Sequence, residues 1–221
     1  MNYIITIVSP KDLGKVTAIH DELSVPVYAA FIARGTAARS MLDLLGIESN
    51  KRRVVMAIAN SEKAAKLVDE IRKRLYIGVP GHGVVISVPI KSIGGGRTVN
   101  VLSEGEKPAK EMPQTSGKYE LIVAIANEGR TDDVMNAARS VGAAGGTVLH
   151  GKGAATEETA KFLNISIASE KEVILIVAKK DRKSEIMRAV LEKAGPGKPA
   201  GAILFSVPVA TVAGFGMYEE Q

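Results

Sequence analysis

The sequence contains no cysteine and no tryptophan, and aromatic residues make up only 4% of its 221 positions. The absence of cysteine excludes disulfide bonds, thiolate metal sites and cysteine nucleophiles, and it favours a reducing compartment, so we expect a cytoplasmic protein. The scarcity of aromatic side chains argues against the stacking surfaces that bind single-stranded nucleic acid. We therefore expect no nucleic-acid partner.

Long apolar runs are also missing. No window approaches the ~18 apolar residues that a membrane-spanning helix needs, and the N-terminus lacks the charged region of a signal peptide. We therefore expect no membrane insertion. The net charge of +5 comes from cations that are mostly interleaved with acidic residues. This pattern indicates solvated faces, and an anion-attracting patch is the alternative.

The chain contains an internal repeat. Residues 3–96 and 119–216 can be aligned, and the best match sets Ile86-Ser87-Val88-Pro89-Ile90 against Phe205-Ser206-Val207-Pro208-Val209. The repeat predicts two domains, at 1–96 and 119–216. Residues 97–118 contain proline and glycine but no apolar periodicity, so they are predicted to form an exposed linker.

Each half shows the same order of predicted elements: strand, helix, strand, short helix, strand, helix, strand. Apolar runs predict the strands Ile4–Val8, Val27–Ala33, Val54–Ala59, Val84–Ile90, Leu121–Ala126, Thr147–His150, Val173–Ala178 and Ala202–Val209. Pro89 and Pro208 cannot donate to a sheet ladder, so the fourth strand of each half is expected at a sheet edge. Thr131 is expected to cap a helix with its hydroxyl group.

The βαββαβ order predicts an α+β fold of two tandem ferredoxin-like domains, each with a four-stranded antiparallel sheet. Two helices cover one face of such a sheet and leave the other face bare. This uncovered face predicts either self-association or packing of the two halves on each other.

Two loops in each half carry the candidate binding residues. Small residues beside a cation expose backbone N–H groups that favour an anion, although a plain strand-to-helix turn explains the first loop equally well. The excess of glycine in the second loop indicates close approach of a ligand or a mobile loop. The candidates in the first loop are Arg34, Gly35 and Thr36 in half one and Gly151, Lys152 and Gly153 in half two. The candidates in the second loop are Gly81, His82 and Gly83, and Gly197, Lys198 and Gly201.

No pattern in the sequence indicates an enzyme. His20, His82 and His150 lack the paired spacing of metal ligands, so no metal site is expected. There is no serine elbow, and no carboxylates are paired at matched positions of the two halves. The segment Gly146–Gly153 has the spacing of a P-loop, but Gly153 stands where that motif needs serine or threonine. We therefore predict a non-catalytic protein.

Three segments of half two resemble the PII nitrogen-regulatory signalling proteins: Gly145–Gly153, Val173–Ala178 and Gly201–Val209. Half one resembles the same family through Arg34-Gly35-Thr36 and Val84–Pro89. The resemblance implies trimers that bind adenine nucleotides such as ATP or ADP in clefts between domains and that regulate a target protein. The family's long T-loop is replaced by two segments that read as short helices, 37–45 and 156–163.

The leading hypothesis is a regulatory protein that senses a small anionic effector, and the alternative is a structural module without a small ligand. Half two offers Lys152 and Lys198, whereas half one offers Arg34 and His82. Because histidine is mostly neutral above a pKa of ~6.5, we expect an anion to prefer half two. A trimer of tandem chains is the expected assembly.

Overall fold

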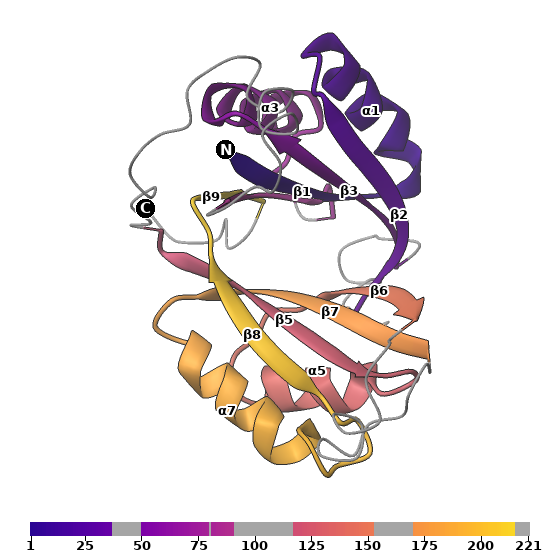
Figure 1. Ribbon diagram of the computed structural model, residues 1–221, viewed down its shortest axis with the longest axis vertical. Helices are drawn as coiled ribbons and strands as arrows, with labels where there is room; N and C mark the ends of the chain where they lie inside the picture. Colours follow the sequence, from indigo (N-terminus) through magenta and orange to yellow (C-terminus); the bar gives the residue numbers. More distant parts are fainter. Residues whose placement is uncertain (37–49, 80, 91–116, 153–169, 215–221) are drawn as a thin grey trace, which may run out of the picture. The chain divides into compact units, whose positions relative to one another are not determined.

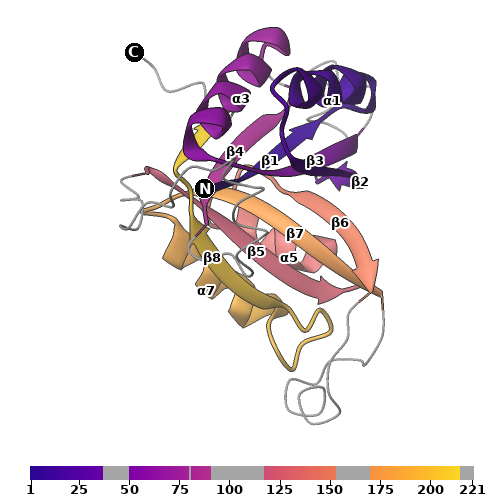
Figure 2. The ribbon, with the colours of Figure 1, turned by 45° about the horizontal axis from the view of Figure 1, so that its top comes forward.

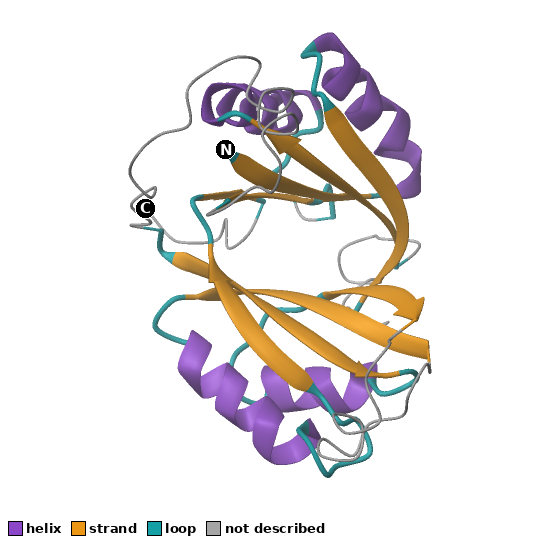
Figure 3. Ribbon diagram, viewed as in Figure 1, coloured by secondary structure: helices purple, strands orange, loops and turns teal. Residues whose placement is uncertain are grey.

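The computed structural model describes residues 1–36, 50–79, 81–90, 117–152 and 170–214. The chain divides into two compact units, and each unit combines separate stretches of sequence. The first consists of Met1–Phe31, Lys51–Gly117 and Pro208–Gln221, and the second of Ile32–Asn50 and Lys118–Val207. Helices and strands are mixed in both units (Figure 3). The segments predicted as short helices, 37–45 and 156–163, lie outside the described residues, as does Gly153.

In the first unit, β3 and β4 both pair antiparallel with β1, which gives the strand order β2-β3-β1-β4. Helices α1 and α3 pack against each other on one face of this sheet (Figure 2). The elements are β1 Asn2–Val8, a 3-10 turn at Pro10–Asp12, α1 Leu13–Glu22, β2 Val27–Gly35, β3 Lys51–Ala59, α3 Ser61–Arg74 and β4 Val84–Pro89. The predicted strands of half one are therefore confirmed, with small shifts at their ends.

The second unit repeats this arrangement. Strands β5 and β6 both pair antiparallel with β7, and the strand order is β8-β5-β7-β6. Helices α5 and α7 lie on one face of the sheet (Figure 1). The elements are β5 Tyr119–Asn127, α5 Thr131–Arg139, β6 Thr147–Lys152, β7 Glu170–Lys179, α7 Lys183–Ala194 and β8 Ile203–Pro208. The last residues of β2 pair antiparallel with β6, with Arg34 opposite Val148.

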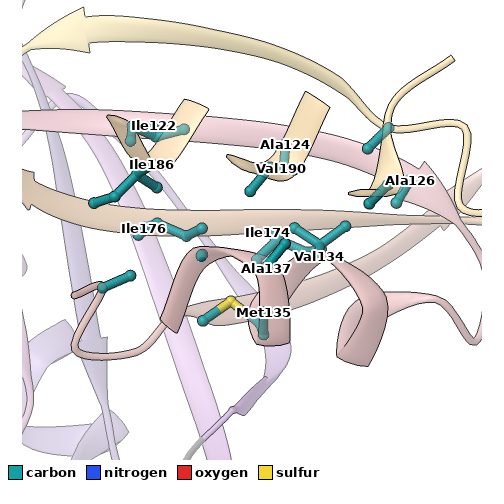
Figure 4. Packing of buried hydrophobic residues seen from close by; sticks show 14 of the residues in the cluster. Ile122, Ala124, Ala126, Val134, Met135, Ala137, Ile174, Ile176, Ile186 and Val190 are labelled. Carbon is teal, nitrogen blue, oxygen red and sulfur yellow. The ribbon is translucent and has the colours of Figure 1, made fainter. Parts of the chain in front are cut away.

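The core of the second unit lies between its sheet and its two helices (Figure 4). Ile122 and Ile176 project from the strands toward Val134, Ile186 and Val190 of the helices, and all five side chains are at most 1% exposed. The strands are apolar on their other face as well. There, a second set of side chains is at most 9% exposed: Leu121, Val123, Leu149, Leu175 and Val177.

The prediction that the fourth strand lies at a sheet edge is confirmed for β8 and wrong for β4. A further strand, β9 (Thr211–Ala213), pairs antiparallel with β4 on the side away from β1. The pairing runs from Val85 to Ser87 and stops before Pro89, so the missing N–H of the proline does not interrupt the ladder.

The prediction that Thr131 caps a helix is also wrong in its detail. Thr131 is the first residue of α5, and the residue before it, Arg130, makes no capping bond with its side chain. The free N–H groups at this helix start are instead satisfied by Glu172 of β7, whose Oε2 accepts hydrogen bonds from the backbone N–H groups of Arg130 and Thr131 at 3.2 and 2.9 Å. A carboxylate also interacts favourably with the positive end of the helix dipole.

Candidate functional site

Both candidate loops of half two lie at one end of the sheet in the second unit. Gly151 and Lys152, the last residues of β6, stand opposite Lys171 and Glu170, the first residues of β7. Lys171 in turn stands opposite Asn127, the last residue of β5. The backbone N–H of Asn127 donates to Ala200 O at 2.9 Å, so the glycine-rich loop before β8 reaches the same end. The strand register thus gathers segments that are far apart in the sequence.

The glycine-rich loop, Gly195–Gly201, is held by its own backbone hydrogen bonds. Lys198 N–H donates to Gly195 O at 3.1 Å, and Gly201 N–H donates to Lys198 O at 3.0 Å. Gly197 and Gly201 have φ values of 81° and 54°, a backbone conformation that favours glycine. Backbone conformation therefore accounts for glycine at positions 197 and 201.

Asn127 connects this loop to β7. Its side-chain N–H donates to Pro199 O at 3.1 Å, while its Oδ1 accepts a hydrogen bond from Lys171 Nζ at 2.6 Å. Lys171 is only 8% exposed, which is unusual for a lysine. Neither Asn127 nor Lys171 was identified from the sequence, because their hydrogen bond joins positions that are 44 residues apart. A lysine at the start of an otherwise apolar strand was the available signal.

Next to this site, Glu172 is buried with 2% exposure. Besides the two backbone groups at the start of α5, its Oε2 accepts a hydrogen bond from the Thr131 hydroxyl at 2.7 Å. Its other oxygen lies 3.8 Å from Nδ1 of His150, whose side chain is half exposed. Sequence reasoning missed Glu172 as well. Its carboxylate fixes the start of α5 relative to β6 and β7.

Gly151 differs from most of the glycines whose surroundings are described. A Cβ atom added at Gly151 would meet no atom within 4 Å, and its φ is outside the left-handed region. Added at Gly146 or Gly195, by contrast, a Cβ would come within 3.1 Å and 2.4 Å of backbone oxygens. Packing therefore explains Gly146 and Gly195, but neither packing nor backbone conformation explains Gly151. Gly14 in α1 has the same open surroundings. Close approach of a ligand is one physical reason for a glycine at position 151.

Residues 119–215 match the family model described as nitrogen regulatory protein P-II. These residues belong to the P-II family. A solved structure of PII from Arabidopsis thaliana, bound to citrate, is 24% identical and has a TM-score of 0.34; the match covers 43% of this chain and 78% of that chain. A comparison with curated proteins gave no match. The recognition made from the sequence is thus confirmed for the second half of the chain.

The first loop of half one is bound to this P-II half. Thr36 N–H and the Thr36 hydroxyl both lie 3.0 Å from Gly146 O, and the hydroxyl also accepts from Gly146 N–H at 2.8 Å. The Arg139 guanidinium donates to Thr36 O. Gly35 N–H donates to Asn50 O at 2.7 Å, and Arg34 is exposed. The N–H and hydroxyl groups of Thr36, which were predicted from the sequence to bind an anion, therefore form hydrogen bonds within the protein.

The second loop of half one lies in the first unit and is tightly packed. Nδ1 of His82 donates to Leu75 O at 2.9 Å, at the C-terminal end of α3. A Cβ added at Gly83 would come 2.2 Å from Ile7 O, and Gly83 has a φ of 119°. Gly81 also has a positive φ, of 87°. Packing and backbone conformation are sufficient to explain Gly81 and Gly83, and His82 caps the end of α3.

Among the residues that the structure describes, no group of three or more His, Cys, Asp or Glu side chains is arranged to hold a metal ion. Within that same part of the chain, no helix is long and apolar enough to cross a membrane.

Proposed function

We propose that the chain is a non-catalytic regulatory protein of the P-II type that senses a small anionic effector, such as ATP, ADP or a similar molecule. The observation that carries this proposal is Gly151, a glycine with open space around it at the sheet end where Lys171 and the loop Gly195–Gly201 also lie. Lys152 and Lys198 supply further positive charge along these segments. Control of nitrogen metabolism is the family's label for such proteins.

We further propose two tandem ferredoxin-like domains, at 1–96 and 119–216, joined by a linker at 97–118. The strand orders β2-β3-β1-β4 and β6-β7-β5-β8 support this proposal, because they have the form expected of βαββαβ domains. A trimer of tandem chains that acts on a target protein in the cytoplasm is the expected biological unit.

The roles of the two halves differ in this proposal. The effector binds to half two, where the loops include open glycines and lysines. The corresponding loops of half one are occupied by internal contacts, at Thr36 with Gly146 and at Gly83 with Ile7. These contacts are also the observation that favours the alternative, a structural module in which loops of this kind only hold the protein together.

A thermal-shift panel tests the proposal. ATP, ADP, a cyclic dinucleotide, 2-oxoglutarate, bicarbonate and citrate are each titrated against the full chain, and a specific ligand is expected to raise Tm in a concentration-dependent way. The double variant Lys152→Ala, Lys198→Ala should then weaken binding at least about tenfold, which is about 1.4 kcal/mol. The matched control, Arg34→Ala with His82→Ala, should bind nearly as well as the wild type.

Three results would contradict the proposal. If no member of the panel raises Tm, the alternative of a structural module is favoured. If the two double variants lose equal affinity in calorimetry, the site is not confined to half two. Release of phosphate from ATP at a steady rate would contradict the non-catalytic assignment.

A further inference from the structure

The end of α1 and the start of β2 form a corner of the first unit that contains a buried histidine. His20 is 0% exposed, and the centroid of its ring lies 4.9 Å from that of Tyr28 in β2. Nδ1 of His20 lies 2.7 Å from Val16 O. Because a carbonyl oxygen only accepts, Nδ1 carries the proton of the neutral ring and Nε2 has the lone pair. Nε2 is buried and has no hydrogen-bond partner in the described parts of the chain.

A protonated ring would not fit this position. Protonation adds an N–H group at Nε2 and a positive charge, and a buried charge without an acceptor costs more free energy inside a protein than in water. Burial accordingly lowers the pKa of His20, and the hydrogen bond to Val16 O and the charge of Asp21 oppose this effect only in part. The closed corner therefore favours neutral histidine.

The other charged and titratable groups around the corner are engaged in contacts of their own. The hydroxyl group of Tyr28 donates to Asp21 Oδ1 at 2.8 Å, on the exposed side of the corner. The remaining groups come from α1 and α3: Glu22 pairs with Arg74 at 2.6 Å, and Lys63 donates to Ser24 O at 2.9 Å. The two cations of α3 give a protonated His20 no favourable partner.

The connection between α1 and β2 is strained at Ser24. Its φ of 50° lies in the left-handed region, which is unusual for a residue other than glycine. Ser24 N–H donates to Asp21 O and Val25 N–H donates to His20 O, both at 2.9 Å, so this conformation closes the end of α1. Strained backbone of this kind persists only where the surrounding contacts hold it. Release of His20 from its contacts would therefore also release the strain at Ser24.

We propose that this corner is an acid-sensitive switch, in which protonation of His20 opens the segment from His20 to Tyr28 away from the core of the first unit. The closed form binds fewer protons than the open form, so the open fraction is smallest above pH ~6.5 and rises as the pH falls below that value. The opening is local, because the bonds of Tyr28 and Lys63 that it breaks are exposed and the paired strands β1, β3 and β4 are not part of it. The switch does not depend on the effector proposed above.

Protection of an introduced cysteine tests the switch, because the natural chain contains no cysteine. Val25→Cys places a thiol in the corner, at a position that is 8% exposed, and Val85→Cys places one in β4, at a position that is 0% exposed. Each variant of the full chain is reacted with dithiodipyridine at about pH 7.5 and about pH 5.5, on either side of the usual pKa of histidine. Each rate is divided by the rate of the same variant unfolded in urea at the same pH, which removes the effect of pH on the thiol itself.

The divided rate of Val25→Cys should rise several-fold at the lower pH, while that of Val85→Cys should stay constant. Adding His20→Leu or His20→Gln to Val25→Cys should remove the rise. The matched control, His150→Gln, changes a half-exposed histidine and should leave the rise intact. A rate of Val25→Cys that does not change with pH overturns the proposal, as does a rise that persists in both His20 variants. An equal rise at Val85→Cys would show unfolding of the whole unit and would also overturn it.

Discussion

Replacing Gly151 by alanine or valine separates a glycine kept for ligand access from one kept for packing. The added Cβ would meet no atom within 4 Å, and φ is not in the left-handed region. Since glycine inside a strand is less favourable than alanine by roughly 0.5–1 kcal/mol, Gly151→Ala should leave the free energy of unfolding unchanged or raise it by up to about that amount. The same variants should lose effector affinity.

The matched control is Gly83→Ala. Here φ is 119°, and the Cβ would lie 2.2 Å from Ile7 O. Backbone strain of this kind costs of order 1–3 kcal/mol, and the collision with the β1 backbone adds to it, so a loss of at least about 3 kcal/mol is expected. Urea unfolding followed by circular dichroism measures both stabilities.

Calorimetry with whichever panel ligand stabilises the wild type measures the affinity. Gly151→Val should bind at least about tenfold more weakly than the wild type, a loss of about 1.4 kcal/mol. A destabilisation of Gly151→Ala by more than about 2 kcal/mol would refute the inference that the site is open. Unchanged affinity of Gly151→Val would refute its role in ligand access.

Three further predictions follow from particular contacts. Asn127→Leu removes the partner of Pro199 O and one partner of Lys171 Nζ, so it should lower the free energy of unfolding by about 1–3 kcal/mol. It should also increase hydrogen exchange at the amides of residues 198–202. Wild-type exchange rates at these amides would contradict the role of Asn127 as a bridge between the loop and β7. Thr36→Val leaves Gly146 N–H without its acceptor and should cost about 1–2 kcal/mol, while Thr36→Ser should retain wild-type stability in urea unfolding. Burial lowers the pKa of His20, against the opposing effects of its bond to Val16 O and the charge of Asp21. The unfolded chain therefore binds more protons than the folded chain as the pH falls below ~6.5, so the free energy of unfolding should be highest above that pH and decrease below it. A plot of Tm against pH should be flatter for His20→Leu than for the wild type.

The sequence was sufficient for the strands whose apolar runs are continuous. Ile4–Val8 and Val173–Ala178 lie within β1 and β7, because short continuous apolar runs rich in β-branched residues are typical of buried strands. It was not sufficient for β9. Thr211–Ala213 is too short to show a period, and its pairing with β4 joins positions more than 120 residues apart in the sequence. The edge position predicted for β4 failed for this reason.

The candidate site was predictable in part. The glycines and lysines of the two loops in half two were identified from their composition, and the strand register places Gly151, Lys152 and the loop before β8 at one sheet end. Asn127, Lys171 and Glu172 were not identified, because their roles arise from contacts across the sheet. A charged residue at the start of an apolar strand can be seen in the sequence, but the sequence does not show which group that residue contacts.

The glycines of the two halves show how one repeated sequence can serve two purposes. In half one, Gly83 is required because a neighbouring backbone leaves no room for a side chain. In half two, Gly197 and Gly151 have open space, and only Gly197 needs glycine for its φ of 81°. The candidate loops thus differ at the positions whose surroundings are described, since Gly83 is enclosed and Gly151 and Gly197 are open. This difference agrees with the proposal above that the effector binds to half two, whereas Gly83 of half one lies against Ile7 of β1.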